Sequence, residues 1–342
     1  MSTTVKNIRK SKHPVSKETI ALCKKLGVEK FIPRSVPFDM SFELHNTTTE
    51  MANAIRRCIN SEIPVLALNF ENSDVKTDDS FIIIHELKKR IGLMPIRQIS
   101  ESVFSLNVKN LSDVIIPVYS SSIRETVKPN TTVKDEMFTG TNILTYLRPG
   151  KSLIISKITT KTGICNVDGP CFSFPGKVGF SCIDLEKMEY DELKKNGKIN
   201  NMSPVSSMDY EASSYRLSIS RQKHIDPAQI VRLGLKTLSD RTSRLLKLVK
   251  QSTGDTYNLD IEITNSSDHT LFKIFGETYT IGNLICKYGL MVDKTMPNIH
   301  CIKLHPTFEN INIYIYHSDP KEIMIMTLQN ILKELSAIKS FF

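Results

Sequence analysis

The sequence predicts an α+β protein made of two matching modules that pair within one chain, with a mostly β insert domain interrupting the first module. Three observations support this prediction. Strand-like alternation followed by an amphipathic helix occurs near both ends of the chain. A six-residue pattern at positions 52–57 recurs at 282–287. Between about 97 and 215 the helical periodicity gives way to short strands separated by Gly and Pro.

The composition is that of an ordinary globular protein. The 342 residues are 40% hydrophobic and 24% charged, and the chain is long enough for two or more domains. It has no run of about 18 apolar residues, and its first residues are polar and basic. We therefore expect neither a transmembrane helix nor a secretory signal peptide, and we expect the protein on the cytosolic side of membranes.

Three of the seven cysteines, Cys165, Cys171 and Cys182, lie close together in the sequence. Their spacing does not match the paired ligands of structural zinc sites. An odd number of cysteines in a reducing compartment is typical of free thiols. We therefore expect no zinc site in this segment.

Positive charge is concentrated at the N-terminus. The net charge of the chain is +9, and residues 1–35 contribute nine Lys or Arg against two Glu. We expect residues 1–15 to be disordered and the whole segment 1–35 to form a basic arm. Such an arm is typical of contacts with nucleic acid or an acidic partner, and a solvated tail is the alternative interpretation.

The first module is predicted from two separate segments, 36–70 and 216–250. Residues 36–45 alternate in polarity, as a strand with one buried face does. The helix that follows has a single apolar stripe, which is formed by Met51, Ile55, Cys58 and Ile59. A second strand is expected at 65–70 and a long basic helix at 228–250.

The insert domain is predicted to span 71–215. Asp78 and Asp79 are expected to begin a helix, with their charge complementing its N-terminus, and Gly92 is expected to end it. Short strands are predicted after this helix, at 103–108, 114–118 and 153–158.

The second module is predicted to span 256–342. A strand at 271–275 precedes a helix at 281–290, for which Thr280 is the expected cap. Two further strands and a final helix are predicted, at 299–304, 311–317 and 320–338.

The repeated pattern suggests how the two modules meet. Ala52–Arg57 and Gly282–Lys287 match as small residue, Asn, apolar, Ile, any residue and basic, 230 positions apart. A module with one apolar helix face needs a cover, and two such modules cover each other as a pseudo-twofold pair. The residues expected at this internal dimer interface are Met51, Ile59, Ile281, Asn283, Leu284, Ile331 and Leu335.

Two motifs in the first part of the chain resemble a known family. Asn53-Ala-Ile-Arg-Arg57 continues into Ser61-Glu-Ile-Pro64, and Arg90-Ile-Gly-Leu-Met-Pro95 follows. Together they resemble the signature of the α-like assembly subunit of multisubunit DNA-directed RNA polymerases. The likeness covers about 36–250, where it is similar to the third subunit of the eukaryotic enzyme.

The last part of the chain resembles the smaller partner of that subunit. Glu277–Leu284, with His305-Pro306 downstream, is similar to the eleventh subunit of the eukaryotic enzyme, over about 256–342. The whole chain therefore resembles a fusion of the two subunits, as found in large DNA viruses that transcribe in the host cytoplasm.

The resemblance implies a non-catalytic assembly platform that nucleates the two large catalytic polymerase subunits and contacts small polymerase subunits. It implies no catalytic residue, cofactor or metal in this chain, contact with DNA only through the complex, no membrane contact and no homo-oligomer. It also implies a location in the host cytoplasm, with packaging in the virion. The residues that the resemblance assigns to the partner interface are Asn53, Ile55, Arg56, Arg57, Ser61, Glu62, Ile63, Pro64, Arg90, Gly92, Leu93 and Pro95.

The alternative function is a stand-alone basic nucleic-acid-binding protein, which would use residues 1–35 and the helix at 228–250. Its expected signature is binding to free duplex that weakens steeply with salt.

Three other patterns have simpler structural explanations. Pro149–Ser152 resembles the end of a phosphate-binding loop, but Thr145 stands where that loop needs Gly, so a turn before a strand is predicted. His300, Cys301 and His305 could suggest a metal site, but adjacent strand residues point to opposite faces. Asp78 and Asp79 could suggest a magnesium site, but no third ligand accompanies them.

Overall fold

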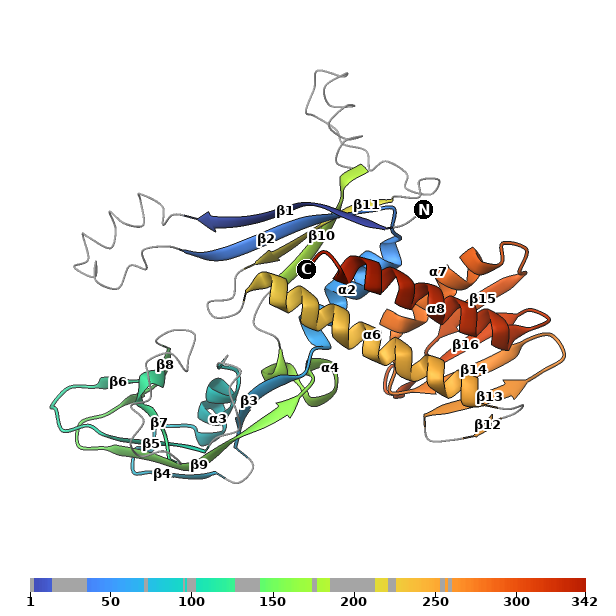
Figure 1. Cartoon of the computed structure of the whole chain (residues 1–342). Coiled ribbons are helices and arrows are strands. Elements are labelled where there is room, and N and C mark those ends of the chain that lie inside the picture. The colour runs from blue at the N-terminus through green and yellow to red at the C-terminus, as the bar shows by residue number, and fades with distance from the viewer. Residues whose placement is uncertain are drawn as a thin grey trace, which may run out of the picture. The chain divides into compact units, whose positions relative to one another are not determined.

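The computed structural model describes residues 3–13, 36–70, 73–94, 96, 103–126, 142–173, 177–184, 213–220, 226–252, 256–257 and 260–342. The chain divides into two compact units, which are considered separately (Figure 1). The larger unit comprises Met1–Ile59 and Gly176–Phe342, and the insert unit comprises Asn60–Pro175. Among the described residues, no helix combines the length and the apolar character needed to cross a membrane.

The first module of the larger unit is a four-stranded antiparallel sheet with two helices. Its strands are β1 (Thr4–His13), β2 (Val36–His45), β11 (Ser214–Ser220) and β10 (Lys177–Cys182), hydrogen-bonded in that order. The helices are α2 (Thr49–Ser61) and α6 (Pro227–Gln251).

The second module is a five-stranded antiparallel sheet with two helices. Its strands are β12 (Thr256–Tyr257), β13 (Ile261–Asn265), β14 (Thr270–Phe275), β16 (Asn310–Tyr316) and β15 (Asn298–Ile302), in that order across the sheet. The helices are α7 (Tyr279–Val292) and α8 (Pro320–Lys339).

The two modules have the same topology. The first runs β1, β2, α2, β10, β11, α6 along the chain, and the second runs β13, β14, α7, β15, β16, α8. The sheet orders β1-β2-β11-β10 and β13-β14-β16-β15 correspond strand for strand, and β12 is an added edge strand. The predicted α+β class with two matching modules is therefore confirmed.

The N-terminal strand β1 was not expected, because residues 1–15 were predicted to be disordered. Thr4–His13 instead pairs with β2 along its length, with Val5 opposite Leu44. Val5 is buried, whereas the following residues, Lys6 to Arg9, are exposed. The strand is held mainly by backbone hydrogen bonds, for which the basic sequence gives no hydrophobic signal. Residues 14–35 of the predicted arm lie outside the described residues.

The insert unit is a second antiparallel β structure. Its main sheet contains β3 (Val65–Asn69), β9 (Ser152–Gly163), β5 (Phe104–Lys109) and β7 (Ile123–Glu125), and β4 (Asp74–Thr77) also pairs with β9. A separate hairpin pairs β6 (Ile116–Tyr119) with β8 (Ile143–Leu147). Helix α3 (Ile84–Gly92) contributes Leu87 and Ile91 to the same hydrophobic core as the sheet. The short elements are η2 (Ser120–Ser122), α4 (Cys165–Asp168) and η3 (Pro170–Phe172).

The ends of the insert differ from the predicted boundaries of 71 and 215. Strand β3, which was assigned to the first module, pairs with β9 of the insert unit. Strand β10, which was assigned to the insert, pairs with β11 in the sheet of the first module. The second module explains the difference, because its equivalent helix α7 leads directly into β15. The insert therefore occupies the connection between α2 and β10.

The helix caps reveal the repeat at the level of single residues. The Met51 backbone N–H donates to the Thr48 hydroxyl at the start of α2, and the Thr280 N–H donates to the Thr278 hydroxyl at the start of α7. Thr48 and Thr278 are 230 positions apart. The predicted cap, Thr280, is therefore wrong, because the cap is Thr278 and α7 begins at Tyr279, two residues before the predicted start at 281.

Candidate functional site: the interface between two matching modules

The last helices of the two modules, α6 and α8, pack against each other in the larger unit (Figure 1). Both begin with an Asp cap followed by Pro, at Asp226-Pro227 and Asp319-Pro320, which are 93 positions apart. Such starts satisfy free N–H groups and preset the first turn. Both helices bury an apolar stripe, which includes Leu238, Leu245, Ile331 and Leu335.

Inside each module, the first helix lies close to the last. A Cβ on Gly234 of α6 would collide with Ile59 Cγ1 of α2. At the equivalent place in the second module, a Cβ on Gly289 of α7 would lie 3.6 Å from Thr327 Oγ1 of α8. Ile59 and Gly289 are 230 positions apart, and Gly234 and Thr327 are 93 apart. The helices are in contact at equivalent places, but only at Gly234 does the close packing of the two helices exclude a side chain on the glycine.

Two polar contacts cross between the modules at equivalent positions. Thr47 of the first module donates through its hydroxyl to Glu334 Oε1 on α8, at 2.7 Å. Arg241 on α6 donates to Glu277 of the second module, with Nη2–Oε2 at 2.5 Å and Nε–Oε1 at 3.3 Å. Thr47 and Glu277 are 230 positions apart, and Arg241 and Glu334 are 93 apart. The contacts are therefore reciprocal, as in an isologous dimer.

Further contacts join the modules away from this reciprocal pair. Arg57 Nε on α2 donates to Thr280 Oγ1 on α7 at 3.1 Å. Lys321 Nζ on α8 donates to the Ser252 carbonyl oxygen after α6 at 2.5 Å. Phe342 packs edge-on against Phe42 of β2, with ring centroids 4.8 Å apart. The interface combines apolar burial with specific polar anchors.

Glu334 is held by both modules at once. Its second oxygen, Oε2, accepts a hydrogen bond from the Tyr288 hydroxyl on α7. Burial first, and then the negative charge of Glu334, raise the pKa of Tyr288 above its usual value. The phenol therefore remains a neutral donor, and Glu334 connects α7, α8 and the start of α2.

Comparison with known proteins identifies the family. Residues 41–242 match the RNA polymerase Rpb3/Rpb11 dimerisation domain, a span of more than half the chain. The chain belongs to this family. A protein named DNA-directed RNA polymerase RPB3-11 homolog, from a Kenyan pig isolate of African swine fever virus, is 27% identical over 89% of this chain and 86% of its own length. The protein of that name from the Badajoz Vero-adapted strain is 27% identical over 88% and 85%. The predicted resemblance to a fused third and eleventh subunit is confirmed.

Six of the seven residues expected at the internal interface of this Rpb3/Rpb11-like chain are buried. They are Met51, Ile59, Ile281, Leu284, Ile331 and Leu335. The seventh, Asn283, is exposed on α7, which corrects its assignment. Asn53 is only half-buried at the equivalent position of α2. Both Asn residues therefore belong to the outward side of their helices.

Four residues assigned to the partner interface are buried within the described structure. Ile55 is fully buried, and Glu62, Ile63 and Gly92 are also buried. Residues buried in this way contribute to the fold rather than to a docking surface. Their assignment is therefore corrected, because the motif includes core residues as well as surface ones.

The remaining assigned residues lie nearer the surface. Ser61 is half-buried, whereas Pro64, Arg90 and Leu93 are exposed. Arg90 Nη1 donates to the Leu144 carbonyl oxygen at 2.9 Å. Pro95 lies outside the described residues.

The Arg pair on α2 has two different roles. Arg57 reaches the second module through Thr280, as described above. Arg56 instead stays beside its own module, where Asn53 Oδ1 accepts from its Nε at 3.0 Å and its Nη2 at 2.7 Å. Its guanidinium also lies 5.8 Å from the ring centroid of Phe180. These contacts hold the Arg56 fork in one orientation and leave its other donors for an external acceptor.

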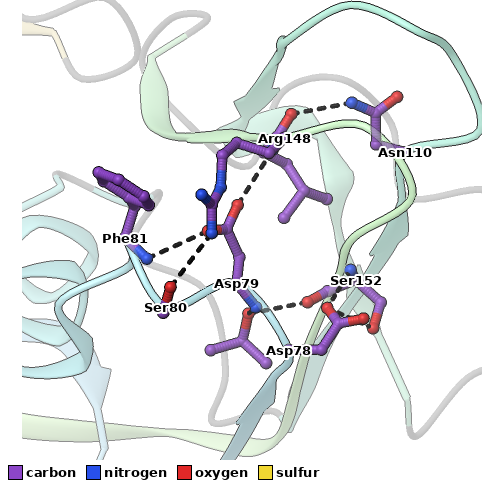
Figure 2. A network of polar contacts seen from close by, with 9 residues as sticks. Asp78, Asp79, Ser80, Phe81, Asn110, Arg148 and Ser152 are labelled. Atoms are coloured by element: carbon purple, nitrogen blue, oxygen red, sulfur yellow. Dashed lines mark hydrogen bonds and ion pairs between the residues drawn. The ribbon is translucent and has the colours of Figure 1, made fainter.

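The adjacent carboxylates of the insert unit, Asp78 and Asp79, form hydrogen bonds within the fold (Figure 2). Asp79 is buried and accepts from the Arg148 backbone N–H at 3.0 Å and from Arg148 Nε at 2.9 Å. Asp78 accepts from the Ser152 backbone N–H at 2.6 Å. Neither carboxylate begins helix α3, which starts at Ile84. The prediction of a helix start here is therefore wrong, and these residues instead bind the turn before β9.

That turn accounts for the phosphate-loop resemblance. Gly150 has φ +71°, and Ser152 is the first residue of β9. The Gly150 N–H donates to the Asn110 carbonyl oxygen at 3.0 Å. A phosphate-binding loop would open a helix at this point, so the predicted strand-initiating turn is confirmed.

The His-Cys-His pattern of the second module is also structural. His300 on β15 stacks on Tyr314 of β16, with ring centroids 4.8 Å apart. The Sγ of Cys301 lies beside Gly282 of α7, and His305 contacts Thr307 in the loop that follows. In the part of the chain that the structure describes, no three or more His, Cys, Asp or Glu side chains gather as metal ligands.

Arg241→Met tests the cross-module ion pair. The Glu277 side chain is 9% exposed, so loss of Arg241 leaves a nearly buried carboxylate without its guanidinium. We expect the free energy of unfolding of the whole chain to fall by about 2–3 kcal/mol, measured by urea denaturation.

Arg244→Met is the matched control on the same helix. Arg244 pairs with Asp260, and their side chains are 58% and 44% exposed, respectively. Exposed ion pairs contribute about 0–1 kcal/mol to the free energy of unfolding. Equal losses for the two variants would contradict the importance of the buried pair.

Asp79 predicts acid sensitivity in the insert unit. Burial raises the pKa of this carboxyl, but hydrogen bonds from Arg148 and the Phe81 N–H outweigh burial and lower the pKa below its usual value. Its stabilising contribution is therefore complete above the ordinary carboxyl pKa and is lost as pH falls through the folded-state pKa.

We expect amide hydrogen exchange, corrected for intrinsic rates, to show falling protection of residues 73–94 and 142–152 between pH 5 and pH 3, values set around the ordinary Asp pKa of about 3.9. Asp79→Asn should have lower protection at pH 5 and a smaller change with pH. An unchanged pH dependence in this variant would assign the acid sensitivity to other groups.

Proposed function

We propose that this chain is the assembly platform on which the two large catalytic subunits of a DNA-directed RNA polymerase are brought together. Its place as a non-catalytic polymerase subunit follows from its family and from the names of its relatives. The specific partners are our inference. They are the two large subunits, together with small polymerase subunits.

The observation that carries the proposal is the pairing of two like modules within one chain. The pairing buries α6 against α8 and fixes the first helices, α2 and α7, through the contact of Arg57 with Thr280. A platform that is already paired loses little conformational freedom when it binds, which favours stable assembly.

The outward side of α2 is the surface that we assign to the second-largest subunit. Asn53 and Phe180 orient the Arg56 guanidinium, and an oriented Arg fork suits carboxylates and backbone carbonyl groups of a partner. On the insert unit, the exposed Pro64 and Leu93 are further candidates for partner contacts. We do not place Arg57 at the centre of this surface, because its Nε is directed to Thr280 of the second module.

Affinity purification of the tagged full-length chain from infected cells tests the platform role. We expect two polypeptides larger than about 100 kDa, a size that reflects large multidomain subunits, to remain bound through salt washes. If neither polypeptide is recovered, the platform role is wrong.

Arg56→Ala tests the surface on α2. We expect a normally folded chain that recovers at least tenfold less of the second-largest subunit. Arg232→Ala, at an exposed position on α6, is the matched loss of one arginine and should recover normal amounts. Normal recovery by Arg56→Ala would remove this residue from the interface.

We also propose that the protein works in the cytoplasm of an infected host cell and is packaged in the virion. Support comes from the resemblance to fused subunits of cytoplasmically transcribing DNA viruses and from the viral source of the relatives. Immunofluorescence of infected cells and immunoblotting of purified virions test both locations. A signal confined to the nucleus would contradict the first, and virions without the chain would contradict the second.

A further inference from the structure

The two equivalent contact points between the modules carry different charges. The position before the cap of the first helix is Thr47 in the first module and Glu277 in the second. The position that it meets on the last helix is Arg241 in the first module and Glu334 in the second. The fold is therefore repeated, but the pattern of charge is not.

The modules could pair in three ways: first with second, second with second, or first with first. The four residues would make different contacts in each pairing. In the observed pairing, Glu277 meets Arg241 and Glu334 meets Thr47. If two second modules paired in the same way, Glu277 of each copy would meet Glu334 of the other. If two first modules paired, each Arg241 would meet the Thr47 hydroxyl instead of a carboxylate. Only the unlike pairing supplies a donor to both carboxylates and a carboxylate to the arginine.

The cost of the wrong pairing follows from burial. Glu277 is only 8% exposed, and Glu334 is half-buried. Carboxylates that meet away from water repel each other strongly, because solvent does not screen them. Tyr288 also donates to Glu334 from within the second module, which holds this carboxylate at the contact point. Two second modules would therefore bring four acidic side chains together in two like-charged contacts.

We propose that Glu277 and Glu334 prevent the second module from pairing with the second module of another copy of this chain, and that Arg241 directs it onto the first module. The apolar α6–α8 packing supplies the general attraction between modules. The charges select which modules pair, because an attractive partner and a repelled competitor together set specificity. This inference concerns the pairing of modules and does not depend on the proposed polymerase partners.

Glu277→Thr and Arg241→Met in the full-length chain separate selection from simple stability. Both variants lose the same ion pair. Only Glu277→Thr also removes the repulsion between two second modules, because Thr is the residue of the first module at this position. Sedimentation equilibrium over a range of concentrations should give a dissociation constant for chain self-association at least tenfold lower for Glu277→Thr than for Arg241→Met.

The contacts between copies are identified by crosslinking a mixture of isotopically light and heavy chains. Pairing of two second modules places α8 of one copy beside α8 of the other, where Lys333 and Lys339 are exposed. We expect crosslinks between these lysines of different copies. Crosslinks that instead join α6 of one copy to α8 of another would reflect exchange of the ordinary pairing, and would overturn the proposal.

A second pair of variants tests the other contact between the modules. Glu334→Thr and Thr47→Val both remove the hydrogen bond between the modules, but only Glu334→Thr removes a carboxylate from the wrong pairing. Stronger self-association of Glu334→Thr alone would support the proposal even if Glu277→Thr does not fold. Equal self-association within each folded pair, whether weak or strong, would overturn it.

Discussion

The structure of the larger unit depends on mutual burial of the last helices, α6 and α8. Each module is a single sheet with helices, and such a layer needs another layer to cover its apolar side. Here the second module provides that cover, and buried residues such as Leu245 and Ile331 lie on the helices that meet. The strand order, the helix caps and the cross-module hydrogen bonds all fit this one requirement.

The sequence was sufficient to predict the repeat, because the match between Ala52–Arg57 and Gly282–Lys287 lies on helices with the same buried side. It was not sufficient for β1, where backbone pairing with β2 outweighs a basic sequence with few buried side chains. The boundaries of the insert were also misplaced, because β3 and β10 read as strands in either unit. Only their hydrogen-bonded partners, β9 and β11, assign them.

The candidate site was predicted as a segment, but not residue by residue. The motif around Asn53–Pro64 contains core residues such as Ile55 and surface residues such as Arg56. The sequence pattern alone does not distinguish the two kinds of residue. Arg57 was taken for a partner contact, since its acceptor Thr280 is 223 positions away and invisible to local reasoning. Likewise, Asp79 is explained by Arg148, 69 positions later. The second spacing, of 93 positions between α6 and α8, is present in the sequence as the shared Asp-Pro start and matching apolar positions such as Ile230 and Ile323, but it was recognised only from the equivalent caps and contacts.

The short connection between the modules has a consequence for the cell that makes this protein. Helix α6 ends at Gln251 and β12 begins at Thr256, so a single translation product delivers both modules in equal number. Separate genes for the two halves would need matched expression. Any excess of one half would leave the apolar side of its last helix exposed, which favours aggregation and proteolysis. Joining them removes the dependence on gene dosage and turns a concentration-dependent encounter into a folding step.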